Sequence, residues 1–301
     1  MRNEGLIGGA VARELMSVTE LARFAPDSVL LQRQVDDAHI ESMRRMKMYS
    51  RAFKVYELDR YLPDTPIPGF NRENYGPAVL DVLRRGLGYM DRLVVSSEML
   101  AEVFRGFNPD VRVLKTRLDP NSWTGLSSKR QTSDRPRVGL SARGALPGDI
   151  ELIADVIKAL ANDVQWVLIG SCPTHLRAFV HEIHGDADEG YPVRLASLNL
   201  DLALVPLQDT LLNRCRSNER LLEFGRLSIP VICSDLEPHR GDLPVTLVKD
   251  GVTPWMEAVR SHLADLEAAH RMGDTLQECV RSDWMMEGLQ LKAWRKIWLP
   301  G

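Results

Sequence analysis

The residues best suited to bind an anion form a short run, Arg216, Ser217 and Asn218, directly before a stretch with helical periodicity. The first backbone N–H groups of a helix lack intrahelical acceptors, and the helix dipole adds positive potential there. The planar guanidinium of Arg216 adds a permanent charge suited to phosphate oxygens. The run therefore predicts an anion site. One alternative stays open: Arg216 is a solvated surface residue and Ser217 is an ordinary helix N-cap.

Two acidic residues, Glu57 and Asp59, end the apolar run VYELD. Residues at the carboxyl ends of parallel strands line ligand sites, so one of these acids could orient or deprotonate a hydroxyl group. The alternative is an acid that caps a helix or forms a salt bridge. His39, which is near two aspartates, is a weaker candidate for the base.

The run HEIHGDAD, residues 181–188, has the composition of a metal cluster. His181 and His184 are three residues apart and could share a helical face, but the pattern is not H-E-x-x-H. We interpret the run as solvated polar surface, and we expect no metal site.

A scaffold of alternating strands and helices is expected to position these residues. The strand candidates are SVLLQRQV, FKVYELD, RLVVSS, VRVLK, RVGLS, VQWVLIG, LDLALVPL, PVICSD and VTLVK. The helical candidates between them are IESMRRMKMYSRA, AVLDVLRRGLGYM, EMLAEVFRGF, IELIADVIKALA and NERLLEFGRL. Near-continuous apolar strands are typical of parallel sheets covered by helices on both faces. A doubly wound α/β fold is the expectation.

A stretch rich in Pro, Ser, Asn and charge, at roughly 118–137, interrupts this alternation and predicts a linker. We expect an N-terminal domain over 1–120 that is short or incomplete, and a C-terminal domain over 136–282. A final helix is expected over 283–301. Trp294 and Trp298 are four residues apart on one face of that helix, so we expect it to pack back on the N-terminal domain.

Composition narrows the class of protein. A length of 301 residues fits two domains, and no apolar run approaches the roughly 18 residues of a membrane helix. A net charge of -3 argues against a sequence-wide basic field for nucleic acid. The four cysteines are far apart, without C-x-x-C, which fits structural roles in a reducing compartment. The N-terminus lacks a secretory signal, so a cytoplasmic location is expected.

The stretch LASLNLDLALVPLQDTLLNRCRSNERLLEFGRLSIPVICSD, residues 195–235, resembles the donor-binding core of GT-B fold glycosyltransferases related to the large retaining (family 4-like) bacterial and phage enzymes. The matching positions are Pro206, Leu207, Asp209, Asn213, Arg216, Ser217, Asn218, Glu223, Pro230, Ser234 and Asp235. Earlier stretches match in the same order: VYELDRYLP, DRLVVSSEMLAEVF, a linker with Trp123, RVGLSARGALPGDIELIADVIKAL and WVLIGSCP. The resemblance implies two Rossmann-like domains facing across a cleft, although the usual first strand and its loop have no counterpart here.

The resemblance also implies an activity of the hexosyltransferase type. A sugar would pass from a nucleotide-sugar donor to an acceptor, which can be a glycan, a lipid-linked saccharide, a protein or a modified nucleic acid. No metal or other cofactor is implied, because basic side chains and helix N-termini replace the cation in such enzymes.

Individual roles follow from the matched positions. Arg216, with the backbone amides of Ser217 and Asn218, would bind the diphosphate. Glu223 would accept hydrogen bonds from the ribose hydroxyls. Its alternative role is that of a surface partner of Arg226 or Arg220. Glu57 or Asp59 would act on the acceptor side.

Two departures from the family pattern bear on activity. Cys215 stands where the family often has a second glutamate, eight residues before Glu223. The loop SARGALPGD, residues 141–149, lacks the usual two glycines and histidine, although Arg143 restores a positive charge and Gly144 follows it. A catalytically degenerate GT-B scaffold or binding protein is therefore the alternative function, and an unrelated sugar-nucleotide epimerase is a third.

Overall fold

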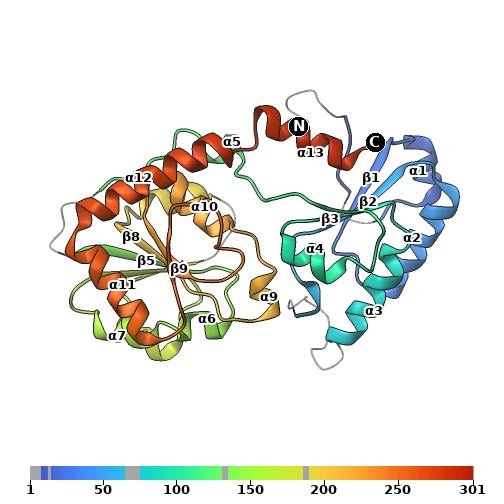
Figure 1. The fold of residues 1–301 in the computed structure, drawn as a ribbon. Helices are drawn as coiled ribbons and strands as arrows, with labels where there is room; N and C mark the ends of the chain where they lie inside the picture. The colour runs from blue at the N-terminus through green and yellow to red at the C-terminus, as the bar shows by residue number, and fades with distance from the viewer. Residues whose placement is uncertain (1–7, 13–14, 65–74, 131–134, 186–189, 301) are drawn as a thin grey trace. The chain divides into compact units, whose positions relative to one another are not determined.

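The computed structural model describes residues 8–12, 15–64, 75–130, 135–185 and 190–300, and the chain divides into two compact units (Figure 1). Unit 1 comprises Met1–Lys115, Arg214–Ser217 and Glu287–Gly301, whereas unit 2 comprises Thr116–Asn213 and Asn218–Met286. The chain thus builds most of unit 1, then unit 2, and returns to unit 1 with its last residues.

Unit 2 is built on a six-stranded sheet whose neighbouring strands are all parallel. Its strands are β5 (Arg137–Ala142), β6 (Gln165–Gly170), β7 (Glu182–His184), β8 (Leu202–Val205), β9 (Val231–Ser234) and β10 (Thr246–Val248). The order along the sheet is β10-β9-β8-β5-β6-β7. The chain runs outward from β5 to β7, returns to β8 beside β5, and continues to β10, which is the order of a doubly wound fold.

Both faces of this sheet are covered by helices, as the continuous apolar strands predicted. The helices are α5 (Pro120–Trp123), α6 (Pro147–Glu151), α7 (Ala154–Ala159), α8 (Tyr191–Ser197), α9 (Leu211–Arg214), α10 (Glu219–Arg226), α11 (Val252–Ala264) and α12 (Leu266–Asp283), with a short 3-10 helix, η3 (Thr174–Leu176). α10 and α12 belong to the apolar cluster on one face, and α7 and α11 to the cluster on the other (Figure 1). Trp123, within the expected linker, is buried in the first cluster.

Unit 1 contains a four-stranded parallel sheet in the order β1-β2-β3-β4. Its elements are α1 (Val18–Phe24), β1 (Ser28–Gln32), α2 (Asp37–Tyr49), β2 (Phe53–Leu58), η1 (Leu62–Asp64), α3 (Tyr75–Leu87), β3 (Arg92–Val95), α4 (Glu98–Phe104), β4 (Val111–Val113) and α13 (Gly288–Trp298). Right-handed crossovers between sequential neighbours place α2, α3 and α4 on the same face. The other face of the sheet is left for α13 (Figure 1).

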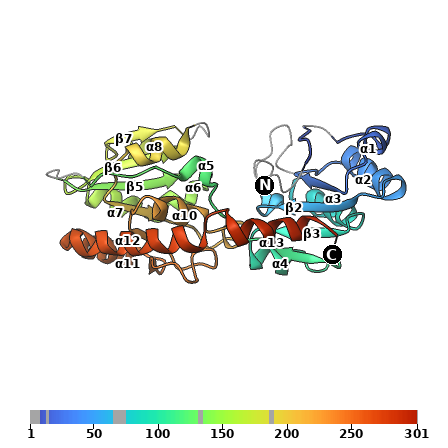
Figure 2. The ribbon, with the colours of Figure 1, turned by 90° about the horizontal axis from the view of Figure 1, so that it is seen from above.

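The C-terminal helix α13 runs beside β3 and closes this second face (Figure 2). Trp294 and Trp298 pack with Ile297 against a small apolar cluster that includes Val55 and Val94. The two indole rings meet edge to face, with centroids 5.4 Å apart. Apolar contacts are therefore one of two attachments between the helix and the sheet.

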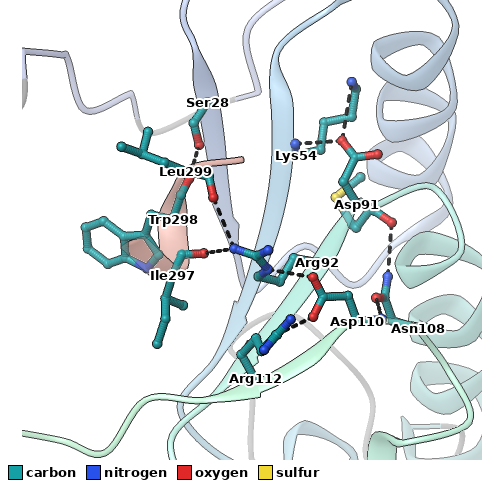
Figure 3. A network of polar contacts seen from close by, with 11 residues as sticks. Ser28, Lys54, Asp91, Arg92, Asn108, Asp110, Arg112, Ile297, Trp298 and Leu299 are labelled. Carbon is teal, nitrogen blue, oxygen red and sulfur yellow. Dashed lines mark hydrogen bonds and ion pairs between the residues drawn. The ribbon is translucent and has the colours of Figure 1, made fainter. Parts of the chain in front are cut away.

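The second attachment is polar and centres on the buried Arg92 of β3 (Figure 3). Its guanidinium donates hydrogen bonds to the backbone carbonyls of Ile297 at 2.6 Å and Leu299 at 3.1 Å, and to the Asp110 carboxylate at 2.8 Å. Ser28 of β1 donates to the carbonyl of Trp298 at 2.6 Å. The last carbonyls of a helix lack intrahelical donors. Here three successive carbonyls at the end of α13 receive donors from the sheet.

Some elements differ from the sequence-based expectation, which contained no counterpart of α1, α5, α8 or α9. The run IELIADVIKALA forms α6 and α7 rather than one helix, because Ile153 leaves helical geometry (φ -116°, ψ 10°) and buries its side chain in the core. His181 and His184 lie at strand β7, which the sequence did not predict, so they share no helical face.

Candidate functional site

The strand order of unit 2 creates one point where consecutive connections leave in opposite directions, between β5 and β8. In open α/β sheets, ligands bind outside the carboxyl ends of the strands at such a switch point. Two loops meet that criterion: residues 143–146 follow β5, and residues 206–210 follow β8. The expected donor-binding residues Arg143 and Gly144 lie in the first loop. Gly144 adopts a φ of +62°, which glycine tolerates without steric cost.

A buried carboxylate, Asp149 of α6, ties these two loops together. One of its oxygens accepts hydrogen bonds from the Gln208 backbone amide at 2.8 Å and the Asn213 side-chain amide at 2.7 Å. The other accepts from the Leu146 backbone amide at 2.7 Å. Because Asp149 is fully buried and bonded to donors from three segments, it fixes both loops of the switch point relative to each other.

Glu223, the expected ribose acceptor, lies on α10 with only 3% of its surface exposed. Its Oε2 atom accepts hydrogen bonds from Arg220 at 2.5 Å and from the Tyr191 hydroxyl at 3.2 Å. Its Oε1 atom lies 3.7 Å from the guanidinium of Arg143. Of the two roles open from sequence, the pairing with Arg220 is present in the structure, but it is buried rather than at the surface.

Arg143 and Arg220 link the loop after β5 to α10. The Arg143 guanidinium lies 4.2 Å from the ring centre of Tyr191, in a cation–π arrangement. Arg220 also donates to the backbone carbonyl of Arg143 at 3.3 Å. Both arginine side chains keep 21% of their surface exposed, while Glu223 lies beneath them. The cluster thus presents two guanidinium groups over one buried carboxylate.

The electrostatics of this cluster follow from burial. Burial raises the pKa of the Glu223 carboxyl, and the positive charges of Arg220 and Arg143 oppose that rise. Burial and the nearby Glu223 charge raise the pKa of the Tyr191 hydroxyl. The nearby Glu219 charge also acts on Glu223 and Arg220, so the cluster can bind an anionic ligand through its two guanidinium groups rather than through an excess of positive charge.

The two candidate acids of unit 1 occupy different surroundings. Glu57 is half-buried at the end of β2 and accepts a hydrogen bond from the Gln32 side chain at 2.9 Å; burial raises its pKa. Asp59 is exposed and pairs with Arg60 at 2.9 Å and Arg33 at 3.3 Å. Burial raises the pKa of Asp59, but its hydrogen bonds and the charges of these arginines outweigh it, so the pKa is lowered. Asp59 therefore has the salt-bridged character that was its alternative, and Glu57 is better suited to accept a proton.

The predicted anion-binding run is divided between the two units. Arg216 and Ser217 belong to the segment Arg214–Ser217 of unit 1, where Ser97 donates a hydrogen bond to the Cys215 carbonyl at 2.9 Å. Asn218 belongs to unit 2 and is the N-cap of α10, so the cap lies one residue later than the Ser217 alternative. Its backbone carbonyl accepts hydrogen bonds from Leu221 and Leu222.

The histidine-rich run lies only partly in the described residues, because 186–189 fall outside them. His181 accepts a hydrogen bond from the Trp166 backbone amide, and His184 pairs with Glu182 at 3.1 Å. Within the described ranges, no group of three His, Cys, Asp or Glu side chains is placed to hold a metal ion. The same residues contain no helix long and apolar enough to cross a membrane.

Sequence reasoning missed two members of the switch-point site, Asp149 and Tyr191, and named Arg220 only as a surface partner of Glu223. For Arg220, the i, i+3 spacing to Glu223 was a usable signal of a helical ion pair. Asp149 follows a proline at the start of a helix, which indicates a first-turn acid but not its role between loops. Tyr191 comes from a helix that was not predicted, so nothing pointed to it.

Comparison with solved structures identifies the architecture. The chain aligns with sucrose-phosphate synthase from Thermosynechococcus elongatus at a TM-score of 0.67 and 14% identity, covering 92% of this chain and 74% of that one. Anabaena HepE in complex with UDP and glucose gives 0.65 at 10% identity, covering 93% and 80%. TarM gives 0.64 at 11% identity, covering 93% and 57%. The chain has the GT-B fold.

Within the GT-B fold, unit 2 contributes the doubly wound sheet and its switch point. The alignment covers little more than half of TarM, so this chain is considerably shorter than that protein. No protein-family model matches the sequence, and no curated protein matches it. At 10 to 14% identity, these likenesses concern the GT-B fold alone.

Proposed function

We propose that this protein is a glycosyltransferase that takes a sugar from a nucleotide-sugar donor bound at the switch point of unit 2. The observation that carries the proposal is the cluster of Arg143, Arg220 and Glu223 at the carboxyl ends of β5 and β8, which sets two guanidinium groups over one buried carboxylate. Guanidinium groups form strong hydrogen bonds with a diphosphate, and a carboxylate can accept hydrogen bonds from both hydroxyls of a ribose. The cluster offers both on a fold that binds UDP in HepE.

The remaining donor-side residues are assigned by their place in the chain. Gly144 lets the backbone of the loop after β5 approach a phosphate closely. Arg216, Ser217 and Asn218 lead into the N-terminus of α10, where N–H groups and the helix dipole favour a phosphate. Within unit 2 we assign the diphosphate to Arg143 and to the N-terminus of α10 at Asn218, and the ribose to Glu223. For Arg216 and Ser217, which belong to unit 1, the diphosphate role rests on the sequence resemblance alone.

Glu57 is the proposed base on the acceptor side. Its raised pKa brings it closer to the range in which a carboxylate removes a proton effectively. Asp59, with two arginine partners, would instead orient groups around it. The acceptor is a hydroxyl-bearing molecule; glycans, lipid-linked saccharides, proteins and modified nucleic acids all supply one.

Donor binding is proposed to be independent of metal. Arginine side chains and the N-terminus of α10 supply the positive charge that a divalent cation supplies elsewhere. UDP affinity should therefore be the same in excess chelator and in added manganese. Binding that disappears on chelation and returns with manganese would contradict this part of the proposal.

Calorimetry with a panel of UDP, GDP, ADP and their sugar conjugates tests the donor site directly. Glu223→Gln keeps the size of the side chain but removes a charged acceptor, which is worth about 1.5–3 kcal/mol per hydrogen bond. Nucleotide affinity should fall about tenfold or more. Arg143→Gln should weaken diphosphates more than the matching nucleosides. Arg240→Gln, which removes an exposed arginine paired with Asp235, is the matched control and should change neither affinity.

A catalytically degenerate GT-B binding protein is the second candidate. It is favoured by one observation: Glu223 is buried, and its Oε2 atom is already occupied by two donors. If none of the panel raises the unfolding temperature or gives a calorimetric signal at millimolar concentration, the glycosyltransferase proposal fails and the degenerate protein takes its place. Binding without hydrolysis or transfer of any donor would also favour it.

A further inference from the structure

Glu223 is not ready to bind a diol in the structure as it stands. Its Oε2 atom accepts from both Arg220 and Tyr191. A carboxylate oxygen has about two lone-pair sites, so both sites of Oε2 are used. A ribose that bonds both carboxylate oxygens can do so only after one of these donors leaves.

Arg220 is the donor that can leave. Tyr191 is 3% exposed, and its ring lies against the Arg143 guanidinium, so its hydroxyl has little room to move. Arg220 has a long flexible side chain that remains 21% exposed. Its second contact, to the Arg143 carbonyl at 3.3 Å, is near the long end of the hydrogen-bond range. When the Arg220 side chain turns toward solvent or toward an anion, the main interaction that it loses is its pairing with Glu223.

We propose that Arg220 is a latch that couples the phosphate and ribose parts of the donor site, an inference that rests on the proposed function. Without ligand, Arg220 neutralises Glu223 and ties the loop after β5 to α10. A diphosphate offers Arg220 a stronger, doubly charged partner and draws it off Glu223. The released carboxylate then accepts the ribose hydroxyls. Arg220 is thus a positioning residue for Glu223 in addition to any contact with phosphate.

The latch has a thermodynamic signature. A nucleoside alone must break the Arg220–Glu223 pair without compensation, whereas pyrophosphate breaks the pair and replaces it. Inorganic pyrophosphate should therefore increase the affinity for the nucleoside, and linkage requires the nucleoside to increase pyrophosphate affinity by the same factor. If the nucleoside and pyrophosphate bound next to each other without Arg220 linking their sites, neither ligand would increase the affinity for the other.

The experiment measures uridine binding by calorimetry with and without saturating inorganic pyrophosphate, in chelator, on the full chain. If the panel selects another base, the matching nucleoside replaces uridine. The expected result is about a fivefold or greater gain in uridine affinity with pyrophosphate. Arg220→Met, which keeps the apolar stem, should bind uridine better than the parent without pyrophosphate, and pyrophosphate should add nothing.

Controls separate the latch from a structural role. Arg226→Met removes another arginine of α10 and should retain the full effect of pyrophosphate. An Arg220→Met variant that weakens uridine and UDP equally, or a parent whose uridine affinity pyrophosphate leaves unchanged, overturns the latch while the donor site stands. A parent that binds no nucleotide of the panel overturns the donor site and the latch together. Because the pyrophosphate effect is measured on the parent, the test holds even if Arg220→Met fails to fold.

Discussion

Two buried arginine–carboxylate clusters, one in each unit, differ in what else the guanidinium contacts. In unit 1, Arg92 bonds Asp110 and also two backbone carbonyls at the end of α13 (Figure 3). In unit 2, Arg220 bonds Glu223 and reaches one loop carbonyl at a longer distance. Backbone carbonyls at a helix end keep a fixed position, so Arg92 stays bound to them. Arg220 has one firm partner, which a ligand can replace.

The comparison teaches how a structural arginine differs from one suited to function. Both side chains are mostly shielded from water, so burial does not separate them. The two arginines differ in whether their partners have another hydrogen-bond donor. The three successive carbonyls of α13 depend on Arg92 and Ser28. Glu223 keeps Tyr191 and Arg143 nearby when Arg220 leaves.

The largest effect is expected from Arg92→Met. The substitution leaves the Ile297 and Leu299 carbonyls without this donor and half of the Asp110 pairing broken, so unit 1 should lose about 3 kcal/mol. Hydrogen exchange of β3 peptides, together with urea unfolding, measures the loss. Arg112→Met removes the other partner of Asp110, but Arg112 is exposed, and less than about 1 kcal/mol is expected. Equal effects of the two variants would remove the distinction that we draw for Arg92.

Trp294→Ala tests the apolar attachment of the same helix. Trp294 is partly buried against the sheet and against Trp298, so its loss should cost unit 1 about 2 kcal/mol. Faster exchange confined to unit 1 is the expected readout. If Trp294→Ala costs more than Arg92→Met, the apolar contacts rather than the polar network hold α13 in place.

Replacing both Arg220 and Glu223 should lower the free energy of unfolding less than replacing Arg220 alone. Arg220→Met alone leaves Glu223 buried beside a more distant arginine, and about 2 kcal/mol of stability should be lost. Adding Glu223→Leu should restore most of it, because well-packed apolar residues often replace a buried ion pair without loss. An Arg92→Met and Asp110→Leu double variant should not regain the lost stability, because the carbonyls at the end of α13 still lack the donor that Arg92 supplied. A urea series on the four variants decides between these outcomes.

The smallest effects concern pH and the two acids of unit 1. Glu57 has a raised pKa, so its ionised form destabilises the fold: the effect is absent below its unfolded value of 4.5 and complete above its folded pKa. Glu57→Gln should therefore gain stability relative to the parent as pH rises from 4 to 7.

Asp59 has a lowered pKa, so its stabilisation is present above 3.8 and is lost as pH falls through the folded value. Asp59→Asn should cost stability at pH 7 and not at low pH. Parallel trends in the two unfolding profiles would contradict these assignments.

Much of the fold could be predicted because buried parallel strands are continuous apolar runs. Nine strands follow directly from such runs, and the GT-B resemblance came from their order with the motifs around Glu223. β7 was missed because a short edge strand of Glu, Ile and His lacks that signal. The break at Ile153 has no glycine or proline to mark it; tertiary packing decides it.

The candidate site was only partly predictable, because its members come together through the fold. Glu223 could be selected from its motif, but its burial depends on Tyr191 and Arg143, which lie 32 and 80 residues away along the chain. Asp149 joins loops that follow β5 and β8, and only the strand order brings those loops together. Residue type and spacing indicate what a side chain can do, whereas tertiary contacts determine whether it is occupied.

The return of the chain to unit 1 sets an order of events during synthesis. Residues 1–115 leave the ribosome first, yet the face of their sheet that α13 covers has no partner until residues 287–301 emerge. About 170 residues of unit 2 come between, which takes roughly 10 to 30 seconds at typical translation rates. Unit 2 is complete in sequence before then and can fold first. Val55 and Val94 of the nascent unit 1 therefore stay uncovered by α13 throughout that interval.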